Sequence, residues 1–158
     1  MTMPMPTLTE GHRNLEKFVG NWAGEEKIYP SPWDPDGGTA IARIQNNLAL
    51  SGFAVIQDYE QDRIGTVNMR GHGVIIWNQE EKNYEFHWFN SMGTPPTVFR
   101  GQFEAGVFTL TCQTPFPSRC IFDFRDEQNY IFQLDISQDG TEWSPFMKGT
   151  YKKQGMTV

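Results

Sequence analysis

The sequence has little positive charge and no long hydrophobic run. Its 158 residues include 13 Lys and Arg against 19 Asp and Glu, which gives a net charge of -6 at pH 7. Phosphate backbones and anionic lipid surfaces attract basic patches, so this composition argues against nucleic acid or a membrane as a partner. No segment approaches the roughly 20 apolar residues that a membrane-spanning helix needs.

The chain also has few cysteines, and its first residues are not expected to form a secretory leader. Its two cysteines, Cys112 and Cys120, fall on successive predicted strands. A disulfide across that hairpin is geometrically feasible, but two reduced thiols are the favoured interpretation. Residues 1–7 contain neither a basic region nor a continuous apolar region, so they do not resemble a signal peptide. We therefore expect a cytoplasmic protein.

Long helices and catalytic motifs are missing as well. No helical pattern of ten or more residues interrupts the strand-like runs, which excludes alternating β–α units and a parallel sheet. The chain contains no nucleophile elbow, no helical His-Glu-x-x-His motif and no phosphate loop. Adjacent acids such as Glu25 and Glu26 send their carboxylates in different directions, which suits a solvated edge better than acid–base catalysis. An enzyme is therefore the less favoured interpretation.

Short strand-like runs and aromatic residues, at 14% of the chain, are abundant. A short helix is predicted from a cap at Thr9 to about Lys17, with Leu15 and Phe18 as an apolar edge that covers one end of the fold. Ten runs follow, separated mostly by hairpin-sized turns. They span residues 20–28, 39–49, 52–61, 67–78, 83–90, 96–104, 106–113, 119–125, 129–136 and 141–152.

Ten short strands in succession predict an all-β fold, an antiparallel up-and-down barrel with a short N-terminal helix. Sequential hairpins close naturally into a barrel, and closure removes the exposed edges that an open sheet would leave. A sandwich is the alternative architecture. We expect residues 1–158 to form one domain, with residues 1–8 flexible.

Two blocks of residues resemble a known superfamily. Gly20-Asn21-Trp22, on the first predicted strand, resembles the opening motif of the calycins, which comprise lipocalins, fatty-acid-binding proteins and their relatives. In lipocalins a basic residue of the last strand packs over this tryptophan, a part that the resemblance gives to Lys148 or Lys152. The second block resembles a bacterial family of small calycin-like barrels of unknown function. It consists of Gly71-x-Gly73, Trp77-Asn78, Tyr84, Trp88 and Asn90-Ser91-Met92-Gly93.

This resemblance covers about residues 15–151 and implies a fold without an established activity.

The register of the predicted strands 67–78 and 83–90 adds information about the interior. A turn centred on Glu80-Glu81 pairs Trp77 with Tyr84. The more apolar face is expected to point inward. It contains Ile75, Trp77, Tyr84, Phe86 and Trp88.

His72 and His87 share the opposite face of the same strand pair. They could in principle ligate a metal or haem, but the sequence offers no third ligand at a suitable spacing. We therefore predict no metal and no cofactor, with haem as a minor alternative. Solvent-facing or hydrogen-bonded histidines are the favoured interpretation.

Polar residues within the strands are candidates for holding a ligand. If they point inward, Arg43, Gln57, Arg125 and Tyr151 could bind a carboxylate or carbonyl group of a ligand. The alternative is that strand alternation turns them outward. Aromatic side chains that line or simply fill the interior complete the predicted binding set. They are Trp22, Tyr84, Phe86, Trp88 and Phe132.

Three classes of function are compatible with this sequence. The favoured one is a barrel that binds a small apolar or amphipathic molecule in its interior, with a basic or amide group at the polar end. An isomerase-like or cyclase-like enzyme would need a buried Tyr, His or carboxylate with a perturbed pKa beside the cavity. A solid barrel that associates with itself, as in a homodimer, would show an exposed apolar patch on its outer wall.

Overall fold

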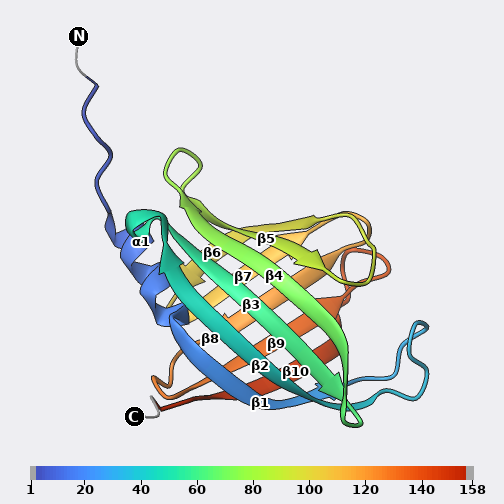
Figure 1. Ribbon diagram of the computed structural model, residues 1–158. Helices are drawn as coiled ribbons and strands as arrows, with labels where there is room; N and C mark the ends of the chain where they lie inside the picture. Colours follow the sequence, from blue (N-terminus) through green and yellow to red (C-terminus); the bar gives the residue numbers. More distant parts are fainter. Residues whose placement is uncertain (1–2, 156–158) are drawn as a thin grey trace.

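The computed structural model describes residues 3–155 and shows a closed barrel of ten antiparallel strands (Figure 1). Consecutive strands are neighbours around the barrel, and the first strand pairs with the last. This confirms the predicted up-and-down barrel and excludes the sandwich. The strands are β1 Gly20–Ile28, β2 Gly38–Ala49, β3 Ala54–Arg63, β4 Thr66–Asn78, β5 Asn83–Asn90, β6 Thr97–Glu104, β7 Val107–Cys112, β8 Ser118–Asp123, β9 Asn129–Ile136 and β10 Ser144–Lys153.

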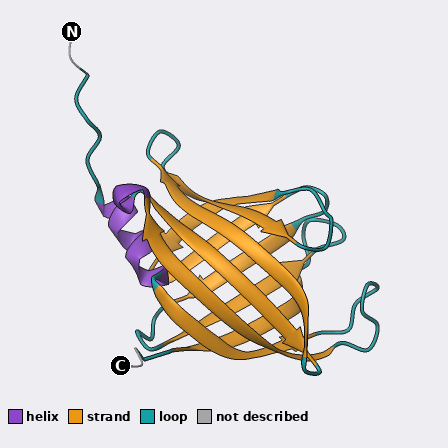
Figure 2. Ribbon diagram, viewed as in Figure 1, coloured by secondary structure: helices purple, strands orange, loops and turns teal. Residues whose placement is uncertain are grey.

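A short helix closes one end of the barrel (Figure 2). It consists of α1, Glu10–Arg13, which continues as the 3-10 turn η1, Asn14–Phe18. As predicted, Leu15 and Phe18 form its apolar edge, and both have an exposed fraction of 0%. The Phe18 ring packs with centroid distances of 4.7 to 5.1 Å against three rings of the barrel, those of Phe108, Phe122 and Phe124. The helix is therefore a plug whose side chains belong to the core.

The opposite end of the barrel, here called the mouth, is formed by the loops that follow β1, β3, β5, β7 and β9. Trp33 of the first loop stacks on Phe116 of the fourth at a centroid distance of 5.1 Å. Both ends of the described chain lie at the plugged end instead (Figure 1). Residues 3–8 extend away from the barrel without regular secondary structure, whereas residues 1 and 2 of the segment predicted to be flexible lie outside the described residues.

The register between β4 and β5 confirms the predicted interior face. Trp77 lies opposite Tyr84 and Ile75 lies opposite Phe86. Ile75, Tyr84 and Phe86 are each at most 4% exposed. The turn at residues 79–82 therefore fixes the pairing, and with it the face that each side chain occupies.

Gly71 and Gly73 make room for two of these inward rings. A Cβ atom on Gly71 would lie 1.9 Å from the ring of Trp88, and one on Gly73 would lie 2.4 Å from the ring of Phe86. Both rings therefore lie directly over the backbone of β4. This close approach explains the two glycines without a nucleotide-binding role.

Trp22 sits beneath the plug and is 2% exposed. Its Nε1 donates a hydrogen bond to the carbonyl oxygen of Phe18 at 3.0 Å, which ties the plug to β1. The basic residue over its ring is Lys153, with Nζ 5.5 Å from the ring centroid, and not the predicted Lys148 or Lys152. Lys153 takes this place because it lies directly opposite Trp22 in the register between β1 and β10.

Cys112 and Cys120 are buried and unbonded. The register pairs Cys112 with Ser118 and Cys120 with Leu110, so the two thiols are diagonal neighbours on β7 and β8.

Within residues 3–155, no helix is long and apolar enough to cross a membrane.

Candidate functional site

One carboxylate lies inside the barrel. Glu26 of β1 has an exposed fraction of 0%, because alternation along the strand places it on the same face as Trp22 and Ile28. The two neighbouring acids Glu25 and Glu26 do point in different directions, and Glu25 is exposed. For Glu26, however, the expected solvated edge is wrong.

Three neutral side chains donate hydrogen bonds to the Glu26 carboxylate. The Tyr59 hydroxyl lies 2.7 Å from both carboxylate oxygens, and Nε2 of Gln61 lies 2.7 Å from Oε1. From the other side of β1, the Tyr151 hydroxyl lies 2.5 Å from Oε2. We call Glu26, Tyr59, Gln61 and Tyr151 the carboxylate cluster. Each member is at most 7% exposed.

The cluster provides hydrogen-bond donors to the carboxyl group of Glu26 but no side chain of opposite charge. Burial, followed by the negative charge of Glu26, raises the pKa of the Tyr59 and Tyr151 hydroxyls well above their ordinary value. Both phenols therefore keep their protons at neutral pH and act as donors. Among residues 3–155, no lysine, arginine or histidine forms an ion pair with Glu26.

Gly149 explains how Tyr151 reaches the carboxylate. The register between β1 and β10 places Gly149 directly opposite Glu26. A Cβ atom on Gly149 would lie 2.1 Å from the Tyr151 hydroxyl oxygen. The Tyr151 side chain therefore runs over Gly149 along its own strand, and any larger residue there would displace it.

Several side chains around Glu26 retain some exposure. Met147, Tyr59 and Gln61 are 8%, 7% and 5% exposed, in contrast to the sealed Glu26. Trp88 and Phe132 are only partly buried, and the Trp88 ring meets Tyr59 edge to face at 5.7 Å. The interior is thus apolar and aromatic near the mouth, with polar donors and a carboxylate beneath.

The two arginines that the sequence suggested as inward anchors point outward. The Arg43 side chain is 52% exposed and its Nη2 binds Oε1 of Glu60 at 2.7 Å. It faces outward because its neighbours Ala42 and Ile44 take the inward positions of β2. Arg125 is 70% exposed and binds Asp123, because β8 ends before Arg125 is reached. For both arginines the alternative, an outward-facing side chain, is therefore the correct one.

The remaining predicted residues divide between the two ends of the interior. Trp22, Tyr84 and Phe86 belong to the plugged half, where the Tyr84 hydroxyl donates to the carbonyl oxygen of Gly11 at 2.7 Å and holds the helix. Gln57 is 4% exposed and shares the inward face of β3 with Tyr59 and Gln61. The Trp88 ring contacts Tyr59 of the carboxylate cluster, Phe132 packs against the buried group that contains Met147, and Tyr151 is itself a member of the cluster.

His72 and His87 lie on the outer wall, as their shared face predicts. Nδ1 of His72 lies 2.8 Å from Oδ1 of Asp58, and Nε2 of His87 lies 2.9 Å from Oε1 of Glu85. Each ring is therefore engaged by a neighbouring carboxylate. In the part of the chain that the structure describes, no group of three or more His, Cys, Asp or Glu side chains is arranged to hold a metal ion.

Sequence reasoning missed Glu26, Tyr59, Gln61 and Met147. A signal for Glu26 was present, because it lies an even number of residues after Trp22 and so shares its inward face. The same period of two connects Gln57 to Tyr59 and Gln61. For Met147 a β-bulge between Pro145 and Met147 shifts the register, so alternation counted from the turn gives the wrong face.

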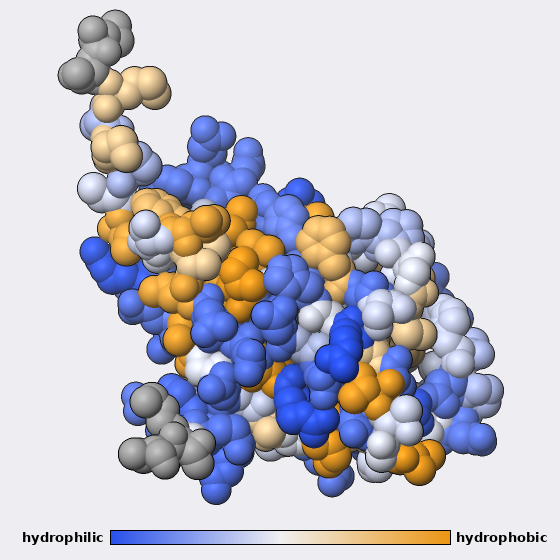
Figure 3. Space-filling model, viewed as in Figure 1, coloured by the Kyte–Doolittle hydropathy of each residue, from blue (hydrophilic) through white to orange (hydrophobic). Residues whose placement is uncertain are grey.

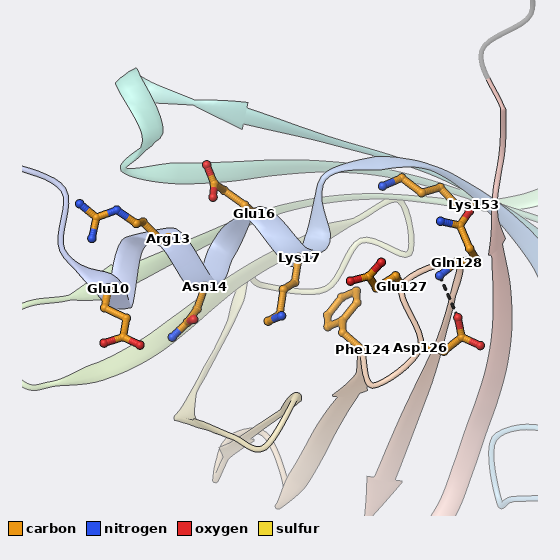
Figure 4. A pocket seen from close by; sticks show the side chains of 10 residues that line it. All are labelled: Glu10, Arg13, Asn14, Glu16, Lys17, Phe124, Asp126, Glu127, Gln128 and Lys153. Atoms are coloured by element: carbon orange, nitrogen blue, oxygen red, sulfur yellow. Dashed lines mark hydrogen bonds between the residues drawn. The ribbon is translucent and has the colours of Figure 1, made fainter.

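Two grooves lie on the outside of the barrel. One, of about 530 Å³, separates the plug from the turn between β8 and β9 and is lined almost entirely by charged and polar side chains (Figure 4). The other, of about 480 Å³, lies on the outer wall of β2 to β4, where Glu60 binds both Arg43 and Arg70. Figure 3 shows a largely hydrophilic face with scattered hydrophobic patches. Neither groove offers the burial found at the carboxylate cluster.

Comparison with known proteins identifies a family and a shared fold. A family model described as "Protein of unknown function (DUF1579)" matches residues 7–153. No curated protein matches the chain. The crystal structure of Rv2717c from M. tuberculosis is similar with a TM-score of 0.71 and 12% identity, covering 94% of this chain and 100% of that one. The S-type phycobiliprotein lyase CPES from Guillardia theta is similar with a TM-score of 0.61 and 13% identity, covering 92% and 93%.

Proposed function

The chain belongs to the DUF1579 family, and we propose that its barrel binds a small amphipathic molecule in the interior beneath the mouth. The observation that carries this proposal is the carboxylate cluster, a buried and hydrogen-bonded polar group in contact with the partly exposed ring of Trp88. Small-molecule sites typically combine an apolar wall with a few convergent polar groups. Trp88 and Phe132 would contact the apolar part of the ligand, and the cluster would fix its polar end.

The energetic cost of the cluster supports a role in binding. Removing a carboxylate from water is strongly unfavourable unless hydrogen bonds and opposite charge compensate. An aliphatic side chain at position 26 would fill the same space without that cost. Glu26 is therefore more readily explained by a ligand that it recognises than by packing.

The two tyrosines of the cluster are suited to binding as hydrogen-bond donors. The raised pKa of Tyr59 and Tyr151 keeps both phenols protonated, so they donate hydrogen bonds and are poor general bases. The likeness to a structure described as a phycobiliprotein lyase supports the proposal only through the shared barrel.

Native mass spectrometry of the purified protein, before and after organic extraction, tests the proposal directly. We expect an extractable small-molecule mass, or calorimetric binding of at least one of three added probes, namely 1-octanol, n-octylamine and octanoate. Trp88→Ala should weaken binding about fivefold, the typical contribution of one aromatic contact. Phe89→Ala is the matched control, because Phe89 is 45% exposed on the outer wall next to Trp88.

Circular dichroism of both variants would separate lost binding from lost structure. A protein that carries no extractable molecule and binds none of the three probes would contradict the proposal and favour a barrel that is packed solid. Equal weakening by Trp88→Ala and Phe89→Ala would place the binding site outside the interior.

A further inference from the structure

The charges of the interior point to one class of ligand. We propose that the molecule bound at the carboxylate cluster carries a protonated amine beside its apolar part. This inference rests on the proposed function and specifies the ligand of that same site. It differs from a basic anchor, one of the possibilities that the sequence left open, since both candidate arginines lie outside and the acidic group inside is Glu26.

Glu26 is a buried carboxyl group with no basic side chain as an ion-pair partner among residues 3–155. It is 0% exposed, and its hydrogen-bond donors Tyr59, Gln61 and Tyr151 are all neutral. No lysine or arginine of residues 3–155 is buried, so none can supply the opposite charge from within the barrel. Buried charges in proteins are normally paired. A ligand ammonium would provide the partner that the chain itself does not.

The mouth carries the same sign of charge as the interior. Its five loops, residues 29–37, 64–65, 91–96, 113–117 and 137–143, contain no Lys, Arg or His. One of their acids, Asp34, binds Arg63 at the end of β3. Such a field attracts cations and repels carboxylates, as does the net charge of -6. The acids of these loops are Asp34, Asp36, Asp139 and Glu142.

Gln61 occupies the position that a ligand amine would take. Its Nε2 donates to Oε1 of Glu26 at 2.7 Å, while its own Oε1 accepts from Nδ2 of Asn68 at 2.8 Å. Gln61 is 5% exposed and Glu26 is sealed, so a molecule entering from the mouth reaches Gln61 first. An ammonium that replaces this amide would donate to the same carboxylate oxygen. The Trp88 and Tyr59 rings beside it suit a cation as well.

Three probes of equal chain length test the charge preference. Isothermal titration calorimetry at neutral pH should show that n-octylamine binds about tenfold or more tightly than 1-octanol, with octanoate weakest, since close charge pairs at buried sites can contribute that much. Glu26→Gln should bring n-octylamine to the level of 1-octanol. Glu25→Gln removes the same charge from the neighbouring exposed position and should leave the preference unchanged.

The possible outcomes separate this inference from the proposed function. If all three probes bind equally well, or octanoate binds best, the amine preference is overturned and the binding function stands. If no probe binds and the purified protein carries no extractable molecule, the binding function and the amine preference are both overturned. The ranking of probes on the unaltered protein decides the inference even where circular dichroism shows that Glu26→Gln does not fold.

Discussion

The two halves of the barrel interior are built from the same strands but have opposite chemistry. Strand β1 contributes Trp22 to the plugged half and Glu26 to the half below the mouth. Strand β10, which runs antiparallel to β1, contributes Met147 and then Tyr151, whose hydroxyl reaches Glu26. The plugged half is a cluster of rings around Phe18, each at most 6% exposed. The mouth half holds the buried Glu26 side chain, next to side chains that are partly exposed.

This contrast separates stability from recognition. Burial of large rings is among the strongest contributions to folding, whereas a buried carboxylate costs free energy that only its partners offset. The alternation of side chains along each strand brings every second residue into the interior but does not dictate whether it is apolar. The closed end of a container can therefore be optimised for packing while the open end retains polar groups for a ligand.

The largest expected effect is a loss of stability on a substitution in the plugged half. Trp22→Ala should lower the free energy of unfolding by about 3 to 5 kcal/mol, because it leaves a cavity and removes the hydrogen bond to Phe18. Urea denaturation measures this change. Trp33→Ala is the control, since Trp33 is 61% exposed at the mouth and should change stability by about 0.5 kcal/mol or less. Similar losses for both variants would refute the assignment of the core to the plugged end.

A smaller effect is expected at the seam between β1 and β10. Gly149→Ala places a methyl group where the Tyr151 hydroxyl now lies and should cost about 1 to 3 kcal/mol in stability, as overpacked cores do. Gly155→Ala is the control, because nothing lies within 4 Å of its added Cβ and its φ is not in the left-handed region. A neutral Gly149→Ala would mean that Tyr151 can leave Glu26 freely. Thermal or urea unfolding distinguishes these results.

The smallest expected effect concerns the pH dependence of stability that Tyr59 contributes in the mouth half. The raised pKa of Tyr59 means that the folded protein keeps a phenolic proton that the unfolded chain loses above pH ~10, the ordinary value. The contribution of Tyr59 to the free energy of unfolding is therefore fully present below pH ~10. Above that pH it decreases by about 1.4 kcal/mol per pH unit for each such tyrosine. Tyr59→Phe should make the decline between pH ~10 and ~11 less steep by that amount. An unchanged slope in urea denaturation would show that Tyr59 is readily ionised in the folded state.

The fold was largely predictable because local patterns determine it. Each of the ten predicted runs corresponds to one observed strand, and the turn after Asn78 correctly set Trp77 opposite Tyr84. Hairpins between consecutive strands require only short-range information. The helix with Leu15 and Phe18 was predictable for the same reason, since its apolar edge is visible in the sequence.

The site was less predictable, for two physical reasons. In β2 both faces carry apolar residues, and Ile41 is 47% exposed, so hydrophobicity could not show that Arg43 points outward. The bond between Glu26 and Tyr151 joins residues 125 positions apart and depends on how β1 meets β10. Such a contact follows from closure of the barrel, which no single hairpin encodes. The inward face of Glu26 was encoded, through its spacing from Trp22.

The ends of the described residues, 3 and 155, both lie at the plugged end, which has a practical consequence (Figure 1). A reporter domain fused there, or a surface to which the protein is tethered, would sit at the far pole from the mouth. The opening would then face the solution whichever end is used for attachment. The barrel is thereby a convenient scaffold for an immobilised sensor in which the mouth half can be redesigned while the plugged half is left intact.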